Sequence, residues 1–227
     1  MKAKRWSFTG LEQFDQCAKQ FNEVRNLKKY PYEATSKEAV WGRYVHKAFE
    51  DRHAARTELP LDLAQHEPFM QRMEAWDGFF FTEQKVALGK DLKPLSNFFD
   101  RDVWWSGIID YTKIEYLAQR ARVVDYKTGK HKPKPGQLVQ NALFTFARYP
   151  DIQIVDAFFY WTQDTKEDRY IYSREQIPQL WAQFVPSLNN LKNAYDTDTW
   201  VAKPSGLCNG WCPVTDCQHW KPKKEKR

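Results

Sequence analysis

Two acidic residues and a lysine on neighbouring predicted strands are the side chains of this sequence best placed to do chemistry. In Asp125-Tyr126-Lys127, alternate residues of a strand share a face, so the carboxylate and the ammonium project together while Tyr126 points away. If the preceding strand folds back as a hairpin centred at 117–118, antiparallel pairing sets Asp110 opposite Asp125. We therefore expect two carboxylates and one ammonium around one cleft.

This pair of carboxylates is suited to holding a divalent cation. Directly opposed side chains have Cβ atoms about 4.5 to 5.5 Å apart, so two bare carboxylates would repel and one would take up a proton. Mg²⁺ removes that conflict, because it accepts carboxylate oxygens together with waters and phosphate oxygens. With Lys127 beside the attacking water or the scissile phosphate, the set would hydrolyse a phosphodiester bond. Taken alone, an Asp-x-Lys pattern also fits a surface ion pair worth less than about 1 kcal/mol.

A histidine and a glutamine on predicted helices are further candidates. Gly42, His46 and Glu50 recur at four-residue spacing, which places His46 at the edge of the packed face of its helix. Gln137 lies in the first turn of a later helix, where it is either an ordinary polar residue or part of the site. For the remaining histidines we expect structural roles; these are His53, His66, His131 and His219.

Three cysteines close together near the C-terminus indicate metal binding. Cys208, Cys212 and Cys217 lie within ten residues, a density more typical of a metal site than of core packing. A fourth thiol, Cys17, lies on the first predicted helix, where it could equally be a core residue. Thiolates alone leave Zn²⁺, an iron-sulfur cluster and a metal-free protein open.

The elements that would position these residues form one α/β domain with a mixed sheet, in the order helix, three strands, helix, two strands, helix. Thr9 and Glu12 match a capping box at the start of the first helix. The expected helices cover residues 10–22, 36–55, 136–149 and 175–195, the last kinked or divided by Pro186, with a turn and a short helix over 57–77. The expected strands cover residues 79–88, 102–114, 120–127, 152–161 and 169–174. We expect one domain over 1–220 and a basic tail over 221–227.

Composition and charge fit a protein that folds around its own core and has an anionic partner. The 227 residues are 42% hydrophobic and 16% aromatic, which excludes a disordered or fibrous chain. The net charge is +6, but five cations and one Glu in the tail KPKKEKR account for +4 of it. No run approaches the roughly 18 apolar residues of a membrane helix, and the start has no apolar secretory segment. We expect a cytoplasmic protein without membrane contact.

Four motifs, in order along the chain, resemble the RecB-like branch of the PD-(D/E)XK nucleases. Gly42-Arg-Tyr-Val-His46 is similar to the helix-borne histidine motif of this family, and Ser106-Gly-Ile-Ile-Asp110 is similar to its G-x-x-D strand. Val124-Asp-Tyr-Lys-Thr-Gly129 resembles the D-Y-K-T-G signature. Gln137-Leu-Val-Gln-Asn-Ala142 resembles the Q-L-x-x-Y-A helix, with Asn141 in place of the Tyr. The resemblance covers about residues 5 to 220 and implies a restriction-endonuclease-like core, a mixed central sheet flanked by helices, with a Cys-rich C-terminal segment closing on the N-terminal helix.

The resemblance also implies a role for each matching residue. Mg²⁺ or Mn²⁺ would be held by His46, Asp110, Asp125 and the backbone carbonyl of Tyr126. Lys127 would be catalytic, and Gln137 would order the site or hold DNA, with Gln140 as a second candidate. Glu83 would correspond to an accessory acidic position.

Iron-sulfur ligation and DNA contacts follow from the same resemblance. A 4Fe-4S cluster would be bound by Cys17, Cys208, Cys212 and Cys217, with Zn²⁺ or no metal as alternatives. Three cations just past the catalytic strand would contact the substrate; these are Lys130, Lys132 and Lys134.

The leading hypothesis is a metal-dependent DNA exonuclease acting on single-stranded or end-bearing DNA. The alternatives are a structure-selective endonuclease on the same scaffold and a non-catalytic DNA-binding or assembly module. Recombination, replication or CRISPR-adaptation proteins are expected partners. DNA repair and phage genome processing remain open as settings.

Overall fold

The computed structural model describes residues 5–30 and 36–223. The chain divides into two compact units, one formed by the segments 1–34 and 184–227 and the other by residues 35–183. The described part of the expected basic tail ends at Lys223, and residues 224–227 lie outside it. The expectation of one nuclease domain over 1–220 remains a prediction. No helix among the described residues is long and apolar enough to cross a membrane.

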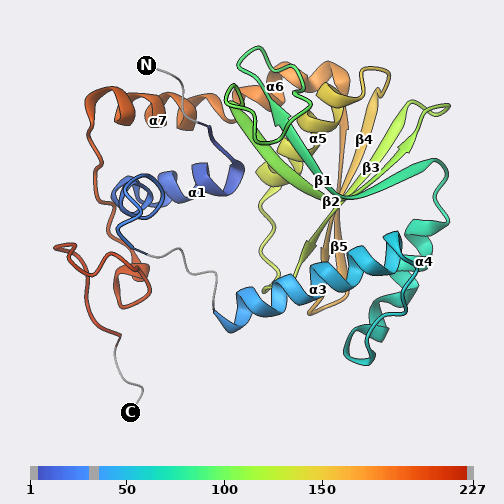
Figure 1. Ribbon diagram of the computed structural model, residues 1–227, viewed down its shortest axis with the longest axis horizontal. Helices are drawn as coiled ribbons and strands as arrows, with labels where there is room; N and C mark the ends of the chain where they lie inside the picture. Colours follow the sequence, from blue (N-terminus) through green and yellow to red (C-terminus); the bar gives the residue numbers. More distant parts are fainter. Residues whose placement is uncertain (1–4, 31–35, 224–227) are drawn as a thin grey trace. The chain divides into compact units, whose positions relative to one another are not determined.

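A five-stranded mixed sheet forms the centre of the second unit (Figure 1). Its strands stand in sequence order: β1 (Phe79–Leu88), β2 (Trp105–Glu115), β3 (Arg120–Lys127), β4 (Ile154–Trp161) and β5 (Lys166–Ser173). The first three form an antiparallel meander, β4 runs parallel to β3, and β5 is antiparallel to β4. This arrangement confirms the predicted mixed sheet.

The β2–β3 hairpin has the predicted register. Its turn covers residues 116–119, and Gln119 adopts a left-handed φ of 49° there. The paired residues run from Glu115 opposite Arg120 to Tyr111 opposite Val124. Continued by one residue, this register places Asp110 opposite Asp125, as the sequence predicts. Beyond Tyr111 the two strands separate, which opens the sheet beside Asp110.

Helices cover both faces of the sheet in this unit (Figure 1). On one face lie α3 (Lys37–Ala54) and α4 (Glu67–Glu74), preceded by the 3-10 helix η2 (Leu61–His66). On the other lies α5 (Pro135–Arg148), and η3 (Arg174–Gln176) and α6 (Ile177–Ala182) follow β5. Apolar side chains from α3, α4 and the sheet pack into one core, with Phe49, Met70 and Met73 almost fully buried.

Side-chain alternation reverses along β1 and β2 at one position, where two facing residues are not paired in the ladder. On β2, Trp105 packs against Phe144 of α5, whereas Tyr111 packs in the core under α3. Both are odd-numbered residues, so regular alternation would have placed them on the same face. The reversal falls at the Glu83–Asp110 position, where the regular pairing of β1 and β2 is interrupted.

The other unit contains α1 (Phe8–Gln16), α2 (Ala18–Phe21), the π-helical turn η1 (Asn22–Asn26), α7 (Val185–Thr197) and the 3-10 turn η4 (Gly206–Cys208). The predicted helix over 10–22 is wrong at Cys17, which is extended with φ −163° and ψ 107° and ends α1. The predicted capping box is also wrong, because Ser7 is the N-cap and its Oγ accepts from the Gly10 N–H. The division of the last helix near Pro186 is confirmed, since α7 begins at Val185.

Candidate active site

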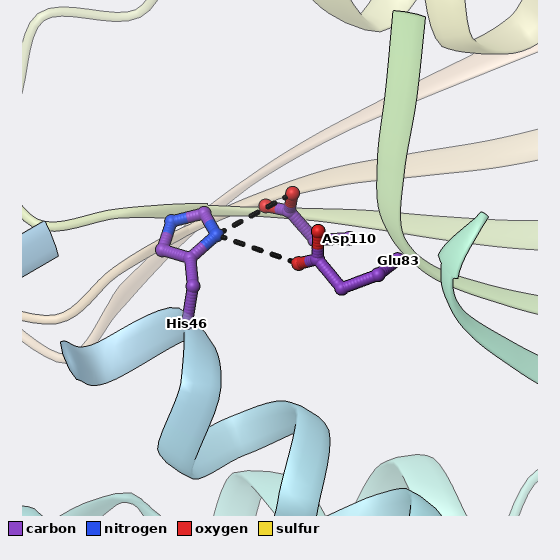
Figure 2. Close-up of side chains that lie close together, drawn as sticks. All are labelled: His46, Glu83 and Asp110. Carbon is purple, nitrogen blue, oxygen red and sulfur yellow. Dashed lines mark ion pairs between the residues drawn. The ribbon is translucent and has the colours of Figure 1, made fainter. Parts of the chain in front are cut away.

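Three side chains from three elements meet beside the gap between β2 and β3. His46 comes from α3, Glu83 from β1 and Asp110 from β2, as Figure 2 shows. One ligand atom from each lies within 4.8 Å of the others. His46 Nδ1 is 3.5 Å from Asp110 Oδ1 and 3.9 Å from Glu83 Oε1. All three residues are half-buried, so the group is open to a ligand.

The other ring nitrogen fixes the orientation of His46. Its Nε2 lies 3.1 Å from the carbonyl oxygen of Tyr126, to which it donates a hydrogen bond. The Tyr126 ring packs edge-on against two side chains of α3, His46 and Phe49. A Cβ at Gly42, one turn before His46, would stand 3.3 Å from Thr128 Oγ1. Glycine therefore lets α3 approach the end of β3 closely enough for His46 to reach the site.

Glu83 has an unusual backbone conformation. Its φ is +47°, a left-handed value uncommon for a residue with a side chain. The β1–β2 pairing has the same register before and after this residue, so Glu83 stands opposite Asp110 although the two are not paired in the ladder. The left-handed residue coincides with the reversal of alternation and with a carboxylate directed at His46. The backbone deviation thus accompanies the formation of the three-residue group.

Asp110 also holds the separated strand β3. Its Oδ2 accepts a hydrogen bond of 2.7 Å from the Tyr126 backbone N–H, while its Oδ1 faces His46. The side chain takes over a strand contact that the ladder no longer makes. Asp110 therefore fixes the backbone of the Asp125-Tyr126-Lys127 segment directly.

Asp125, Lys127 and Gln137 form a second group on the α5 side of the sheet. Lys127 Nζ lies 2.7 Å from Asp125 Oδ1 and donates to Gln137 Oε1 at 2.7 Å. The predicted shared face of Asp125 and Lys127 is confirmed, and so is the opposite direction of Tyr126. Asp125 is buried and does not belong to the close group of His46, Glu83 and Asp110. Its predicted role as a metal ligand remains a prediction, as does that of the Tyr126 carbonyl.

Electrostatics at the site favour positive charge between the carboxylates. Burial lowers the pKa of His46, but the charges and hydrogen bonds of Asp110 and Glu83 outweigh it and raise the pKa to about 10. Burial raises the pKa of Asp125 to about 6, where Lys127 opposes the rise and Asp110 adds to it. The carboxylates thus repel as the sequence analysis expects, and a cation would relieve that repulsion.

The donor set fits a divalent cation. Carboxylate oxygens are ligands for Mg²⁺, and the added imidazole nitrogen suits Mn²⁺ and later transition ions. The three ligand atoms lie in one small region. Because Nε2 is engaged by Tyr126, Nδ1, which faces the two carboxylates, is the nitrogen that would bind the cation.

The two glutamines of α5 have different roles. Gln137 reaches Lys127, whereas Gln140 is buried and accepts a 3.0 Å hydrogen bond from the Trp105 indole. A Cβ at Gly107 would stand 2.7 Å from a Phe144 ring carbon and 3.0 Å from Gln140 Nε2. The glycine of the G-x-x-D pattern therefore allows α5 to pack closely on β2, which positions Gln137.

Asn141 occupies the place of the tyrosine in the resembled motif. It is buried, and neither its amide nitrogen nor its amide oxygen has a hydrogen-bond partner among the described residues. A buried amide without partners is costly, because both groups have lost water.

The three predicted substrate lysines lie on the exposed loop after β3; they are Lys130, Lys132 and Lys134. Two polar contacts anchor this loop to the sheet. His131 Nε2 lies 2.9 Å from Asp168 Oδ2, and Gln163 Nε2 donates to the Thr128 carbonyl at 3.0 Å. The three lysines are thus exposed and close in sequence to Lys127.

All four cysteines line one cavity in the unit built from both chain ends; they are Cys17, Cys208, Cys212 and Cys217. Two backbone N–H groups point at sulfur atoms: Lys203 donates to Cys17 Sγ at 3.4 Å and Ser205 donates to Cys208 Sγ at 3.5 Å. The cysteine-bearing segment is also tied by an ion pair of 2.6 Å between Lys29 and Asp216. The extended backbone at Cys17 belongs to this arrangement.

The chain belongs to the PD-(D/E)XK nuclease superfamily, whose family profile matches residues 5–217. This match makes it a nuclease-family protein and agrees with the mixed sheet and flanking helices. A crystal structure from Eubacterium rectale, of a protein described as a candidate exonuclease, has the same fold with a TM-score of 0.51 and 14% identity, covering 100% of this chain and 91% of that one. The structure of a protein called SSO0001 matches with a TM-score of 0.48 and 12% identity, covering 96% and 88%. A comparison with curated proteins finds no significant match.

Sequence reasoning gave Glu83 only an accessory place, whereas the structure puts it in the close group with His46 and Asp110. The available signal was the β1–β2 register, which sets Glu83 opposite Asp110. Regular alternation conceals the signal, because the left-handed backbone at Glu83 reverses it.

Proposed function

We propose that the protein is a metal-dependent DNA exonuclease that hydrolyses phosphodiester bonds of single-stranded or end-bearing DNA. The observation that carries the proposal is the group of His46, Glu83 and Asp110, with ligand atoms within 4.8 Å, in a chain of this superfamily. The ion pair of Asp125 and Lys127 lies on the adjoining strand. Together they supply a cation site and an ammonium on one stretch of sheet.

The cation would be Mg²⁺ or Mn²⁺, bound by His46, Glu83 and Asp110, with Asp125 completing the set. The Tyr126 carbonyl, predicted as a further ligand, instead accepts the hydrogen bond from His46 Nε2. When bound, the cation would polarise the phosphate and lower the pKa of a bound water. The protein holds Nδ1 of His46 toward the site through the Nε2 hydrogen bond to Tyr126. That contact fixes the ring before any ligand arrives.

Lys127 would hold the phosphate or the attacking water. Its ammonium is already oriented by Asp125 on one side and by Gln137 on the other, at 2.7 Å each. An ammonium has three donors, so a third remains for a phosphate oxygen or a water. Gln137 acts as a positioning residue, since it contacts Lys127 itself.

DNA as the substrate is supported by the superfamily and by exposed cations near the site. Lys130, Lys132 and Lys134 follow the catalytic strand directly and are exposed. The choice of an exonuclease over an endonuclease rests on the motif resemblance and on the description of the Eubacterium rectale protein.

The experiment compares end-labelled linear DNA with covalently closed circular DNA, each with Mg²⁺, Mn²⁺ or EDTA. The wild-type protein is tested beside Lys127→Ala and a charge-matched control, Lys90→Ala, whose side chain is exposed in the β1–β2 connection. We expect degradation of the linear DNA by wild type and by Lys90→Ala, only with metal, and none by Lys127→Ala. Cleavage of the circle would replace the proposal with an endonuclease. Binding without any cleavage would replace it with a DNA-binding module.

For the cysteines, the corresponding proposal is a 4Fe-4S cluster with a structural role. Support comes from the four thiols around one cavity and from the N–H groups directed at Cys17 and Cys208. Four thiolates also suit a tetrahedral Zn²⁺, so metal analysis decides between the two.

The test is anaerobic purification followed by visible absorption and by iron, sulfide and zinc analysis, with Cys208→Ser as comparison. We expect about four iron and four sulfide per chain in the wild type and loss of both in the variant. Stoichiometric zinc, or no metal, would refute the cluster. Neither result bears on the nuclease test.

A further inference from the structure

A large cleft lies on the α3 side of the sheet, as the candidate metal site does. It has a volume of about 790 Å³, within the range of cavities that bind small molecules. Its walls come from the C-terminal end of α3, from α4 and from the neighbouring ends of β1 and β2. None of the metal-site or Lys127-group residues lines it, so it is a separate feature.

Two nitrogen groups in its wall, a buried imidazole nitrogen and the ammonium of a largely buried lysine, have no hydrogen-bonding partner within the described part of the chain. His53 is 4% exposed, and its Nε2 makes no hydrogen bond. Lys113 is 6% exposed and forms no hydrogen bond or ion pair with a described residue; its Nζ lies 5.7 Å from the centre of the Phe80 ring. Burying an imidazole nitrogen without a partner is costly, and an ammonium without an ion pair can take an anion, so the two groups point to a ligand that would pair with them.

Acidic groups in the same wall are largely neutralised. Arg52 forms ion pairs with Glu67 and with Glu74, the latter at 2.7 Å. Glu58 and Arg56 are both exposed in the wall, and their opposite charges cancel in the net charge of the cleft. Arg56 forms no ion pair with any residue the structure describes. The carboxylates of Asp77, Glu115 and Glu74 act on Lys113 at longer range but form no ion pair with it, so its ammonium can take an anion.

An aromatic surface adjoins these nitrogens. Phe80 is 43% exposed, and its ring is nearly parallel to that of Tyr111, with an interplanar angle of 7° and centroids 6.0 Å apart. The His53 ring lies 4.7 Å from Tyr111 and 6.4 Å from Phe80. An exposed aromatic face beside a cation and a hydrogen-bonding nitrogen suits a nucleotide, whose base stacks and whose phosphate takes the charge.

The cleft lies a short distance from the cation site along each of three elements. His53 follows His46 by seven residues of α3, or about 10 Å at 1.5 Å per residue. Phe80 precedes Glu83, and Lys113 follows Asp110, by three residues of strand, also about 10 Å. That length equals about three stacked nucleotides at 3.4 Å each, so one DNA strand could occupy both places.

We propose that this cleft binds one nucleotide of the substrate strand, up to about three positions from the scissile phosphate. The base lies against Phe80 within reach of His53 Nε2, and the phosphate lies beside Lys113. The inference rests on the proposed DNA substrate and adds a second, base-stacking contact to it.

The test measures binding of fluorescent twelve-nucleotide thymidine strands by anisotropy in EDTA, so that no strand is cut. The variants are Phe80→Ala and Lys113→Met. Their controls are Phe79→Ala, since Phe79 is 69% exposed on the same strand and does not line the cleft, and Lys90→Met. An abasic strand of the same length separates base contacts from phosphate contacts. Thermal unfolding of each variant checks the fold.

Phe80→Ala is expected to weaken binding by about 5- to 100-fold on the thymidine strand, and to have no effect on the abasic strand. Lys113→Met is expected to weaken binding to both strands and to reduce the slope of log Kd against log salt by about 0.7. Because the ammonium forms no ion pair with a described residue, Lys113→Met is also expected to unfold at the wild-type temperature or above it. The controls are expected to bind like wild type.

Equal affinities for Phe80→Ala and Phe79→Ala on the thymidine strand, while wild type digests linear DNA with metal, would overturn the inference and leave the proposed function intact. An equal effect of Phe80→Ala on the abasic strand would also overturn it, since no base would then be stacked. Failure of wild type to bind or cut any DNA would refute the proposed function itself.

Discussion

Replacing His53 should remove a defined part of the pH dependence of folding. Burial lowers the pKa of this imidazole from 6.5 to about 4, with Arg52 and Lys113 contributing in the same direction and Glu74 and Glu67 opposing. Between these two pKa values the unfolded chain binds a proton that the folded protein does not bind. Stability therefore rises with pH across this window and is lost as pH falls from 6.5 toward 4.

The size of the effect follows from the two pKa values. Their difference corresponds to about 3 kcal/mol when fully expressed, and His53 is 4% exposed, so solvent screening reduces it little. At pH 5 about 2 kcal/mol of stability is lost relative to pH 7 through this residue alone. Burial also lowers the pKa of His66. His66 therefore adds a loss of stability at low pH that is the same in wild type and in a His53 variant.

Urea unfolding followed by tryptophan fluorescence at pH 5 and pH 7 measures the effect. The difference in unfolding free energy between the two pH values should be about 2 kcal/mol smaller in His53→Gln than in wild type. His219→Gln, which changes a histidine that is not buried, serves as the control and should keep the wild-type difference. The same pH difference in His53→Gln and wild type would refute the reasoning.

Three further substitutions test the packing and the cation site. Gly107→Ala should destabilise the protein by about 1 to 3 kcal/mol in urea unfolding, because its Cβ would meet α5 side chains at 2.7 and 3.0 Å. Asn141→Leu should raise the unfolding free energy by about 1 kcal/mol, because it removes two buried polar atoms without partners. Glu83→Gln should weaken Mn²⁺ binding at least tenfold in calorimetry, because one of three carboxylate or imidazole ligands loses its charge.

Two of these changes have a matched control variant, and Asn141→Leu is compared with wild type. Gly206→Ala, where a Cβ would meet nothing within 4 Å, should change stability by less than about 0.5 kcal/mol. Glu50→Gln removes a carboxylate from α3 outside the close group and should leave Mn²⁺ affinity unchanged. The packing argument is contradicted if Gly107→Ala is as stable as Gly206→Ala. The argument about Asn141 is contradicted if Asn141→Leu is less stable than wild type. The cation-site argument is contradicted if Glu83→Gln and Glu50→Gln bind Mn²⁺ with equal affinity.

Strand periodicity and turn position predict most of the sheet. The bounds of β1 and β3 agree with the expected ranges, and the hairpin register follows from the turn near 117–118. These features depend on local sequence, because alternation and turn residues act within a few positions.

Helix faces were harder to predict. Val40 and Tyr44 belong to the apolar stripe of α3 by spacing, yet they are 52% and 39% exposed, whereas Val45 and Phe49 are buried. Spacing identifies a stripe, but the tertiary contacts decide which part of it is covered. Cys17 interrupts its helix for a similar reason, since its extended backbone places the thiol at a cavity formed with distant residues.

The site residues also include some that the sequence predicts and one, Glu83, whose place it does not predict. The motifs place His46, Asp110, Asp125, Lys127 and Gln137, and the structure joins them in two neighbouring groups. Glu83 depends on a left-handed backbone in an edge strand, which no residue preference at that position indicates.

The hairpin turn at 116–119 lies far from the candidate active site, but its length controls which residues meet there. The length of this turn sets the register of every pair from Glu115–Arg120 to Tyr111–Val124. Insertion or deletion of one residue would slip the register by one and send the side chains of one strand to the other face of the sheet. Exposed turns usually tolerate changes of length. In this protein the length of the turn sets the register of β2 and β3, so the site requires that length as much as it requires Asp110 or Asp125.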